Sequence, residues 1–294
     1  MTRTQAATAY SELNTVLGHL VAGAQEVLQR NFVGAYLQGS FAVGDHSAFS
    51  DCDFVIVVEA DLAADQLAGL QNLHQYIQRL PCDYWHKNLE GSYAPKQILR
   101  RWATEPRDPP GEPRDAHWGD PAMDGAPARC YPFWYLNHGS DTLVRSEHDN
   151  SQVVRWTLRE HGVRLAGPPP EELIDPVSAS ALRSEVRATM DLAIDTGLLM
   201  SSFALQAFWV GLFCRILHTI ETGRITSKKA ALQWARAMLD PQWHTLVDQA
   251  LTLRKGDRAQ ALALVNPQTQ TATRAFAHHC RRQADVRLAD RPDD

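Results

Sequence analysis

A glycine-serine turn followed at short range by two aspartates constrains the fold of this chain more than any other feature of its sequence. Residues 33–38 have the pattern of a strand that leads into Gly39 and Ser40, and ten residues separate this turn from Asp51 and Asp53, which open a second, strongly apolar strand. Side chains at positions i and i+2 of a strand point to the same side. The sequence therefore predicts two carboxylates presented together beside a tight turn.

This arrangement suits a metal ion and a polyphosphate. Two neighbouring carboxylates repel each other, and a hard divalent cation compensates their charge. Gly39 has no Cβ, so its backbone can approach a phosphate closely, and the turn N–H groups and the Ser40 hydroxyl can bind phosphate oxygens. A lone Asp-x-Asp is usually a solvated strand end. The combination predicts one or two Mg²⁺ ions, held by Asp51 and Asp53, with a nucleoside triphosphate that we take to be ATP.

A metal beside a bound triphosphate suits the transfer of a nucleotide to a hydroxyl group. This reaction also needs a general base near the attacking oxygen. Two acidic residues follow the next helix pattern, Asp83 in LPCDYWHKN and Glu90 in LEGSYAPK. Glu90 is favoured because it begins a strand pattern that could lie beside the strand of Asp53. The residues alone leave both alternatives open.

The order of the elements predicts an α+β fold in which a mixed sheet is followed by a helical bundle. We place an α/β domain at residues 1–150, with a Pro-, Gly- and Asp-rich insert at 103–132, and a helical domain at 151–294. The elements expected in the first domain are helices at 5–30 and 62–80 and strands at 33–38, 54–58 and 89–93. Later helices are expected at 151–161, 179–195, 202–221, 228–238, 241–255 and 271–286.

Composition excludes several classes of protein. A net charge of -5 argues against a general nucleic-acid-binding surface. The five cysteines are widely spaced and odd in number, which fits free thiols better than disulfides or a zinc site. The N-terminal segment reads as an amphipathic helix, and no apolar run is long enough to predict a membrane span. We therefore expect a cytoplasmic monomer that binds small molecules.

The segment GSFAVGDHSAFSDCDFVIVV resembles the signature of polymerase-β-type nucleotidyltransferases. More specifically, the chain is similar to the aminoglycoside 3''-adenylyltransferases of the streptomycin and spectinomycin type, because REHGVRLAGPPPEELIDPV resembles their interdomain connector and CRILHTIETGRITSKKAALQWA resembles a segment of their helical domain. The likeness runs from about residue 30 to 255. It implies Mg²⁺-dependent transfer of AMP from ATP to a small hydroxylated acceptor, and antibiotic resistance as the outcome if the acceptor is an aminoglycoside.

The resemblance also implies roles for particular residues. Ser40, Asp51 and Asp53 match its phosphate and metal positions, and Glu90 falls where the family has its third carboxylate, which supports Glu90 as the base. Four positions would bind the nucleotide beside the metal: Gly39, Ser50, Arg215 and Lys228.

One departure from the family concerns the acceptor. The family has acidic residues that meet the cationic groups of the drug just before the segment of Arg215, whereas this chain has the apolar stretch GLLMSSFALQAFWVGLF there. A different acceptor, such as another metabolite or a protein side chain, is therefore an alternative. A nucleotide-binding module without catalysis is a second alternative.

Aromatic and histidine residues give weaker signals. Trp118, Trp134 and Tyr135 could line a substrate pocket, although core packing is the more frequent use of such residues. His138 and His148 lack zinc-like spacing, as does the pair His278-His279, so we expect all four to be ordinary surface or core residues.

Overall fold

The chain forms two compact units, Met1–Pro176 and Val177–Asp294. The computed structural model describes residues 6–46, 50–102, 130–198, 200–254 and 262–291. The division between the units falls after the boundary expected at residue 150, because β6 (Val163–Ala166) pairs with β1 (Phe32–Leu37) in the sheet of the first unit. Most of the expected insert, residues 103–129, lies outside the described part of the chain.

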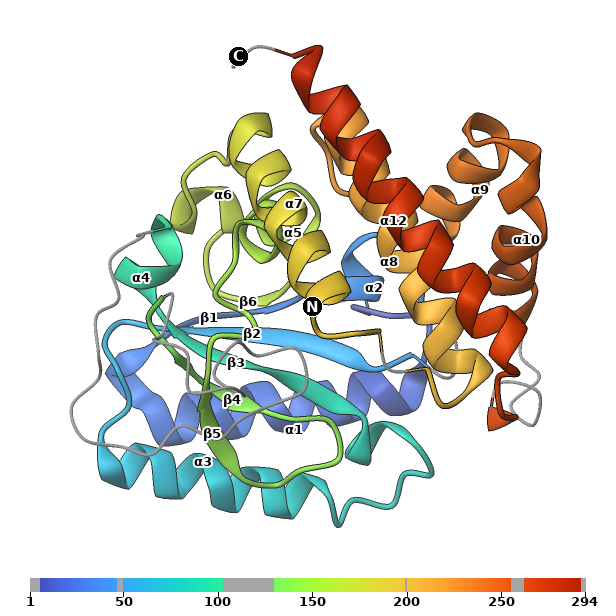
Figure 1. The fold of residues 1–294 in the computed structure, drawn as a ribbon. Helices are drawn as coiled ribbons and strands as arrows, with labels where there is room; N and C mark the ends of the chain where they lie inside the picture. Colours follow the sequence, from blue (N-terminus) through green and yellow to red (C-terminus); the bar gives the residue numbers. More distant parts are fainter. Residues whose placement is uncertain (1–5, 47–49, 103–129, 199, 255–261, 292–294) are drawn as a thin grey trace. The chain divides into compact units, whose positions relative to one another are not determined.

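The first unit contains a six-stranded sheet with the strand order β5-β4-β3-β2-β1-β6 (Figure 1). β2 and β3 run parallel and the other neighbouring pairs are antiparallel, so the mixed sheet that the sequence predicts is confirmed. Its remaining strands are β2 (Cys52–Val58), β3 (Leu89–Pro95), β4 (Phe133–Leu136) and β5 (Leu143–Ser146).

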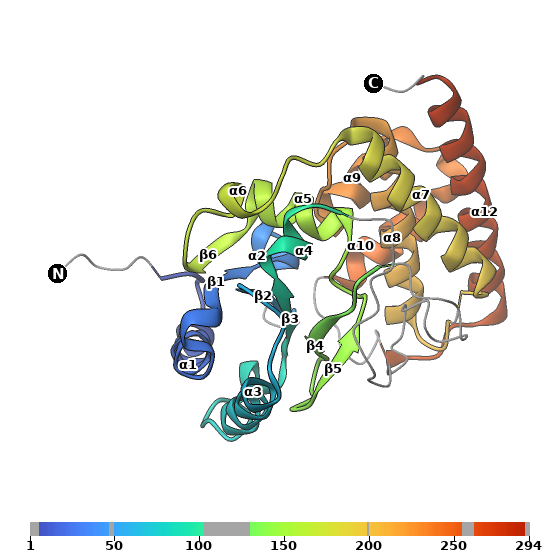
Figure 2. The ribbon, with the colours of Figure 1, turned by 90° about the vertical axis from the view of Figure 1, so that its left-hand side faces the viewer.

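Helices cover both faces of this sheet (Figures 1 and 2). The long helices α1 and α3 lie along one face, and α4, α5 and α6 lie on the other. The helical elements are α1 (Ser11–Leu28), η1 (Gln29–Asn31), α2 (Gly39–Ala42), α3 (Ala64–Ile77), η2 (Trp85–Lys87), α4 (Lys96–Arg100), α5 (Gln152–His161) and α6 (Pro170–Leu173).

The alternation of side chains along β2 divides the core of this unit. Cys52, Phe54 and Ile56 pack in the cluster under α1 and α3. Val55 and Val57 pack in the cluster on the opposite face, with residues of α4, α5 and α6. Because side chains alternate along a strand, Asp53 points to the same face as Val55 and Val57. The apolar side chains of Val55 and Val57 therefore continue the strand behind the site.

The second unit is a bundle around one apolar helix, α8 (Phe203–Thr222), which packs against α7, α9, α10 and α12. Over the described part of the chain, α8 alone is long and apolar enough to cross a membrane, but 56% of that apolar window is buried within the structure, as in the core helix of a globular bundle. The other elements are α7 (Ala179–Asp195), α9 (Lys228–Met238), η4 (Pro241–Trp243), α10 (His244–Leu253) and α12 (Pro267–Ala289).

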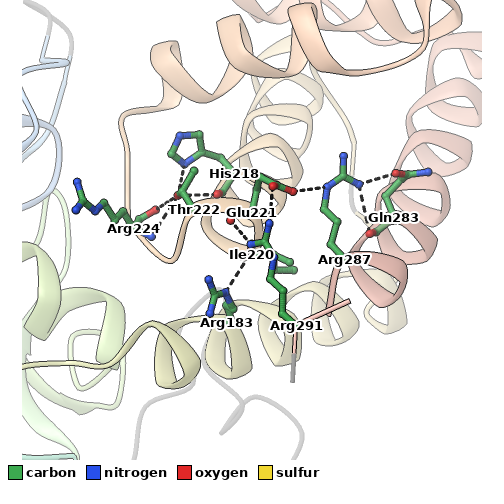
Figure 3. Close-up of polar contacts among 9 residues, drawn as sticks. All are labelled: Arg183, His218, Ile220, Glu221, Thr222, Arg224, Gln283, Arg287 and Arg291. Carbon is green, nitrogen blue, oxygen red and sulfur yellow. Dashed lines mark hydrogen bonds and ion pairs between the residues drawn. The ribbon is translucent and has the colours of Figure 1, made fainter. Parts of the chain in front are cut away.

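A cluster of arginines binds the carboxyl end of α8 (Figure 3). Arg183 from α7 and Arg291, which follows α12, both donate to the carbonyl oxygen of Ile220, at 3.0 and 2.9 Å. The Glu221 carboxylate accepts hydrogen bonds from Arg287 and Arg291. The last carbonyl groups of a helix lack partners within the helix and carry partial negative charge, so these arginines fasten three helices at one point.

The pH dependence of stability should report on a buried histidine under the sheet. His74 is 1% exposed and its imidazole lies 2.8 Å from the Tyr93 hydroxyl. Burial lowers the pKa of His74 from 6.5 to about 4. In the unfolded chain this group gains a proton near pH 6.5, so its contribution to stability is complete above that pH and is lost as the pH falls toward 4. A pKa difference of this size corresponds to about 3 kcal/mol.

We therefore expect the urea midpoint of the wild-type protein to fall over this pH range, as measured by circular dichroism. The double substitution His74→Phe and Tyr93→Phe removes both members of the pair and leaves neither polar group unsatisfied. It should give a shallower pH dependence over the same range. An unchanged slope would show that His74 titrates normally in the folded protein.

Candidate active site

The first amino acids of two parallel strands bring together the carboxylates that the sequence predicts. Asp53 on β2 is the register partner of Glu90 on β3. Side chains of paired residues in neighbouring strands lie next to each other on one face of a sheet. Asp83, the alternative to Glu90, is exposed in the segment before η2. The structure therefore places Glu90, and not Asp83, in register with Asp53.

The glycine-serine turn lies against the carboxylate of Asp53. Gly39 has a φ angle of 58°, and a Cβ added to it would lie 1.9 Å from Asp53 Oδ2. The backbone N–H of Gln38 donates to the Asp53 carbonyl oxygen at 2.9 Å, which fixes the turn to β2. The Ser40 hydroxyl oxygen is buried and has no hydrogen-bond partner in the described structure. A buried hydroxyl without a partner is costly, and a bound phosphate oxygen would satisfy it.

Asp51 lies just before β2 and takes part in a second group of ligand atoms. One carboxylate oxygen of Asp51, one of Glu90 and a ring nitrogen of His138 all lie within 4.8 Å of one another. His138 Nδ1 is 2.9 Å from Asp51 Oδ1, and both side chains are nearly half exposed. Ser50, directly before Asp51, is partly buried. The ligand atoms of this group therefore lie at the solvent-accessible edge of the sheet.

The surroundings of Glu90 restrict its carboxylate. The Tyr135 hydroxyl donates to Glu90 Oε1, and His148 Nε2 is 3.6 Å from the same oxygen. Burial, together with the nearby negative charge of Glu90, raises the pKa of Tyr135 well above its ordinary value. Tyr135 therefore keeps its proton and remains a donor, which leaves Glu90 Oε2 as the oxygen for other partners.

These residues fit a hard divalent cation together with a polyphosphate. The carboxylates of Asp51, Asp53 and Glu90 supply oxygen ligands of the kind that Mg²⁺ prefers. The turn supplies a close backbone approach at Gly39 and the buried hydroxyl of Ser40. Carboxylates suited to a cation and groups suited to a phosphate thus meet at one end of β2.

Two of the predicted nucleotide-binding residues belong to the helical unit. Arg215 lies on α8 and is partly buried. Lys228 is the first residue of α9, is exposed, and has its amino group 5.6 Å from the centre of the Phe208 ring. Ser227 caps this helix by accepting from Ala230 N. Because a helix N-terminus attracts anions, Lys228 adds a cation to an end that already favours negative charge.

The structure revises the interpretation of several other residues. His138 and His148 lie beside Asp51 and Glu90 and are not unrelated surface residues. No local sequence pattern indicated this, because the two histidines are far from Asp51 and Glu90 along the chain. The pairing of β3 with β4 and of β4 with β5 brings them near these carboxylates. Trp134 packs in the core under α1, whereas Tyr135 faces the site. Trp118 lies outside the described residues.

Comparison with known proteins matches both units of the chain. Residues 23–105 match the family described as "Nucleotidyltransferase domain". Residues 172–281 match the family described as "Aminoglycoside adenylyltransferase, C-terminal domain". The chain is thus similar to nucleotidyltransferases in its first unit and to aminoglycoside adenylyltransferases in its helical unit. The similarity to these two families and the predicted fold class, a mixed-sheet part followed by a helical part, are thereby confirmed.

Two individual proteins of this group show how far the similarity extends. The aminoglycoside (3'') (9) adenylyltransferase of Rhizobium radiobacter is 30% identical over 118 residues, which are 38% of this chain and 40% of that protein. The crystal structure of spectinomycin adenyltransferase AAD(9) from Enterococcus faecialis, with ATP and spectinomycin, matches with a TM-score of 0.63. That match covers 92% of this chain and 98% of the other at 14% identity, and therefore shows a common fold.

The contact of Gly39 with Asp53 gives a direct test of the site. Gly39→Ala places a methyl group where the Asp53 carboxylate lies. Gly44→Ala is a matched control, because Gly44 has a similar φ of 68° with nothing within 4 Å of its added Cβ. Both variants should lose about 1 kcal/mol of stability to backbone strain.

Only Gly39→Ala should also displace the carboxylate, with a loss of nucleotidyl transfer on the order of 100-fold. Thermal denaturation and steady-state kinetics measure the two effects separately. Equal activity of the two variants would remove Gly39 from the site.

Proposed function

We propose that the protein transfers AMP from ATP to a hydroxyl group of a small molecule, with aminoglycoside antibiotics as the acceptor class. The observation that carries this proposal is the register pairing of Asp53 with Glu90 at the strand end where the Gly39 turn lies. The pairing supports the proposal because Asp53, the proposed metal ligand, and Glu90, the proposed base, are neighbours in the region that matches a nucleotidyltransferase domain.

Each proposed site residue of the first unit has a defined task in this reaction. The turn at Gly39 and Ser40 binds the phosphates of ATP through backbone N–H groups and the Ser40 hydroxyl. Glu90 accepts the proton of the acceptor hydroxyl, whose oxygen attacks the α-phosphorus and displaces pyrophosphate. Asp51 and Asp53 would hold Mg²⁺, which would neutralise phosphate charge during such a reaction.

The helical unit would complete the nucleotide site. The pattern of the family suggests that Arg215 and Lys228 contact the triphosphate, where Arg forms paired hydrogen bonds and Lys acts as a point charge. Ser50, directly before Asp51, would add a further contact to phosphate.

The composition of α8 bears on the choice of acceptor. From Phe203 to Arg215 this helix contains no acidic residue, and Trp209 and Val210 are buried in it. An aminoglycoside carries several positive charges, which would favour carboxylates in its binding site. An acceptor with fewer charges than a typical aminoglycoside is therefore a second candidate.

Pyrophosphate release tests the reaction and the acceptor together. We expect release when the protein is incubated with ATP, Mg²⁺ and streptomycin or spectinomycin, and none with Asp53→Ala. If neither antibiotic supports release, an extract of small metabolites and one of proteins, each with labelled ATP, should show which class becomes labelled. Binding of ATP without labelling in any extract would instead indicate a non-catalytic nucleotide-binding module.

The proposed base and the proposed metal ligand should fail in different ways. Glu90→Gln should lower kcat on the order of 100-fold or more, while binding of a non-hydrolysable ATP analogue stays close to that of the wild type. Asp53→Ala should abolish both turnover and the Mg²⁺-dependent part of analogue binding. Isothermal titration calorimetry and kinetics distinguish the two outcomes; a Glu90→Gln enzyme with normal kcat would reassign the base.

Two neighbouring lysines provide a matched pair for the helical unit. Lys228 and Lys229 are both exposed at the start of α9. If Lys228 contacts the triphosphate, Lys228→Ala should raise the KM for ATP about tenfold, the effect of losing one charge-assisted hydrogen bond. Lys229→Ala should change KM by less than about twofold. Equal effects would indicate a general electrostatic contribution of the two charges.

A further inference from the structure

A buried carboxylate that has no part in the proposed reaction joins two parts of the site. Asp149, in the segment between β5 and α5, is 4% exposed. Its Oδ1 accepts a hydrogen bond from Gln38 Nε2 at 2.9 Å, and its Oδ2 accepts one from Ser92 Oγ at 2.7 Å. Gln38 and Ser92 are also buried. Burying a carboxylate is costly unless it receives such hydrogen bonds.

The two donors belong to the two halves of the site. Gln38 is the residue directly before Gly39 and Ser40, and its own backbone is hydrogen bonded to Asp53. Ser92 follows Glu90 by two residues on β3, so both side chains point to the same face of the sheet. Ser92 is also the register partner of Tyr135, which donates to Glu90. Asp149 therefore receives one hydrogen bond from the phosphate-binding turn and one from the strand of the base.

We propose that Asp149 is a positioning residue that sets the distance between the phosphate-binding turn and the carboxylate of Glu90. The inference rests on the proposed function for its kinetic consequences, whereas its structural consequence holds independently. Charge-assisted hydrogen bonds are about twice as strong as neutral ones, and both bonds to Asp149 end on one rigid group. Loss of its charge loosens the turn and the strand together.

The two arms of the network predict different kinetic defects. Gln38→Leu removes the donor on the side of the turn, and it should mainly raise the KM for ATP. Ser92→Ala removes the donor on the side of β3, and it should mainly lower kcat because Glu90 is no longer held in place. Asp149→Asn weakens both arms and should show both defects, with a loss of kcat/KM on the order of 100-fold.

A second hydrogen-bonded carboxylate in the same unit, the partly buried Asp61, provides the control. Asp61, which follows the opposite end of β2, binds Arg145 at 2.6 Å and accepts a hydrogen bond from Tyr131. Asp61→Asn makes the same change of carboxylate to amide in a partly buried network that includes none of the proposed site residues. It should lower the melting temperature and leave kcat and KM within about twofold of the wild type.

The experiment combines kinetics with hydrogen exchange on the full-length protein. In Asp149→Asn, backbone amides of the peptide covering residues 38–46 should exchange several-fold faster than in the wild type, and those in Asp61→Asn should not. This exchange measurement needs no substrate, so it tests the inference even if the wild type releases no pyrophosphate with any acceptor. Unchanged exchange in Asp149→Asn, or kinetic losses of equal size in Asp61→Asn, would overturn the proposal.

Discussion

The site depends on one feature of the sheet, the parallel pairing of β2 with β3. Cys52 pairs with Leu89 and Asp53 with Glu90, so both strands start at the same edge. Because strand register fixes which side chains are neighbours, a shift of one residue would turn Glu90 toward α1 and away from Asp53. The alternation along β3 opposes that shift, since Leu89 and Tyr93 fill the core under α1 and α3, whereas Ser92 points to the opposite face and binds Asp149.

Close packing at this edge leaves room only for glycine in the turn. The Asp53 carboxylate occupies the space that a Cβ of residue 39 would need, and the backbone there has a positive φ angle. Two independent physical constraints, steric contact and backbone conformation, thus select the same residue. The same closeness brings the Ser40 hydroxyl and the turn N–H groups next to the carboxylates, where a metal and phosphates would compensate one another's charge.

Buried or partly buried charges hold separate elements together at two places in the described structure. Asp149 joins Gln38, directly before the Gly39-Ser40 turn, to Ser92 on β3 through two hydrogen bonds. In the helical unit, Glu221 joins the end of α8 to α12 through Arg287 and Arg291, and Arg183 adds α7 (Figure 3). A buried ion pair adds little net stability over apolar packing, but removal of one partner is strongly destabilising. Such contacts therefore fix the positions of the elements that they join more than they add to the free energy of unfolding.

The sequence by itself determined the elements that local patterns encode. Strand and helix periodicity located β1, β2, β3 and the long helices of the second unit, and α9 begins and ends at the residues predicted for it, Lys228 and Met238. The Gly39-Ser40 turn and the Asp51 and Asp53 pair were found for the same reason, since each lies within one short segment. The short strands β4, β5 and β6 were missed, because four residues carry too little periodicity to be recognised.

Only the tertiary structure decided which distant residues join the site. Strand pairing put Glu90 rather than Asp83 beside Asp53, and the chain through β4 and β5 brought Tyr135, His138 and His148 to the same carboxylates. It also buried Asp149 between Gln38 and Ser92, residues 111 and 57 positions away in the chain. Local sequence patterns reflect the conformation of neighbouring residues, whereas these contacts depend on how whole strands pair and pack, which no single segment encodes.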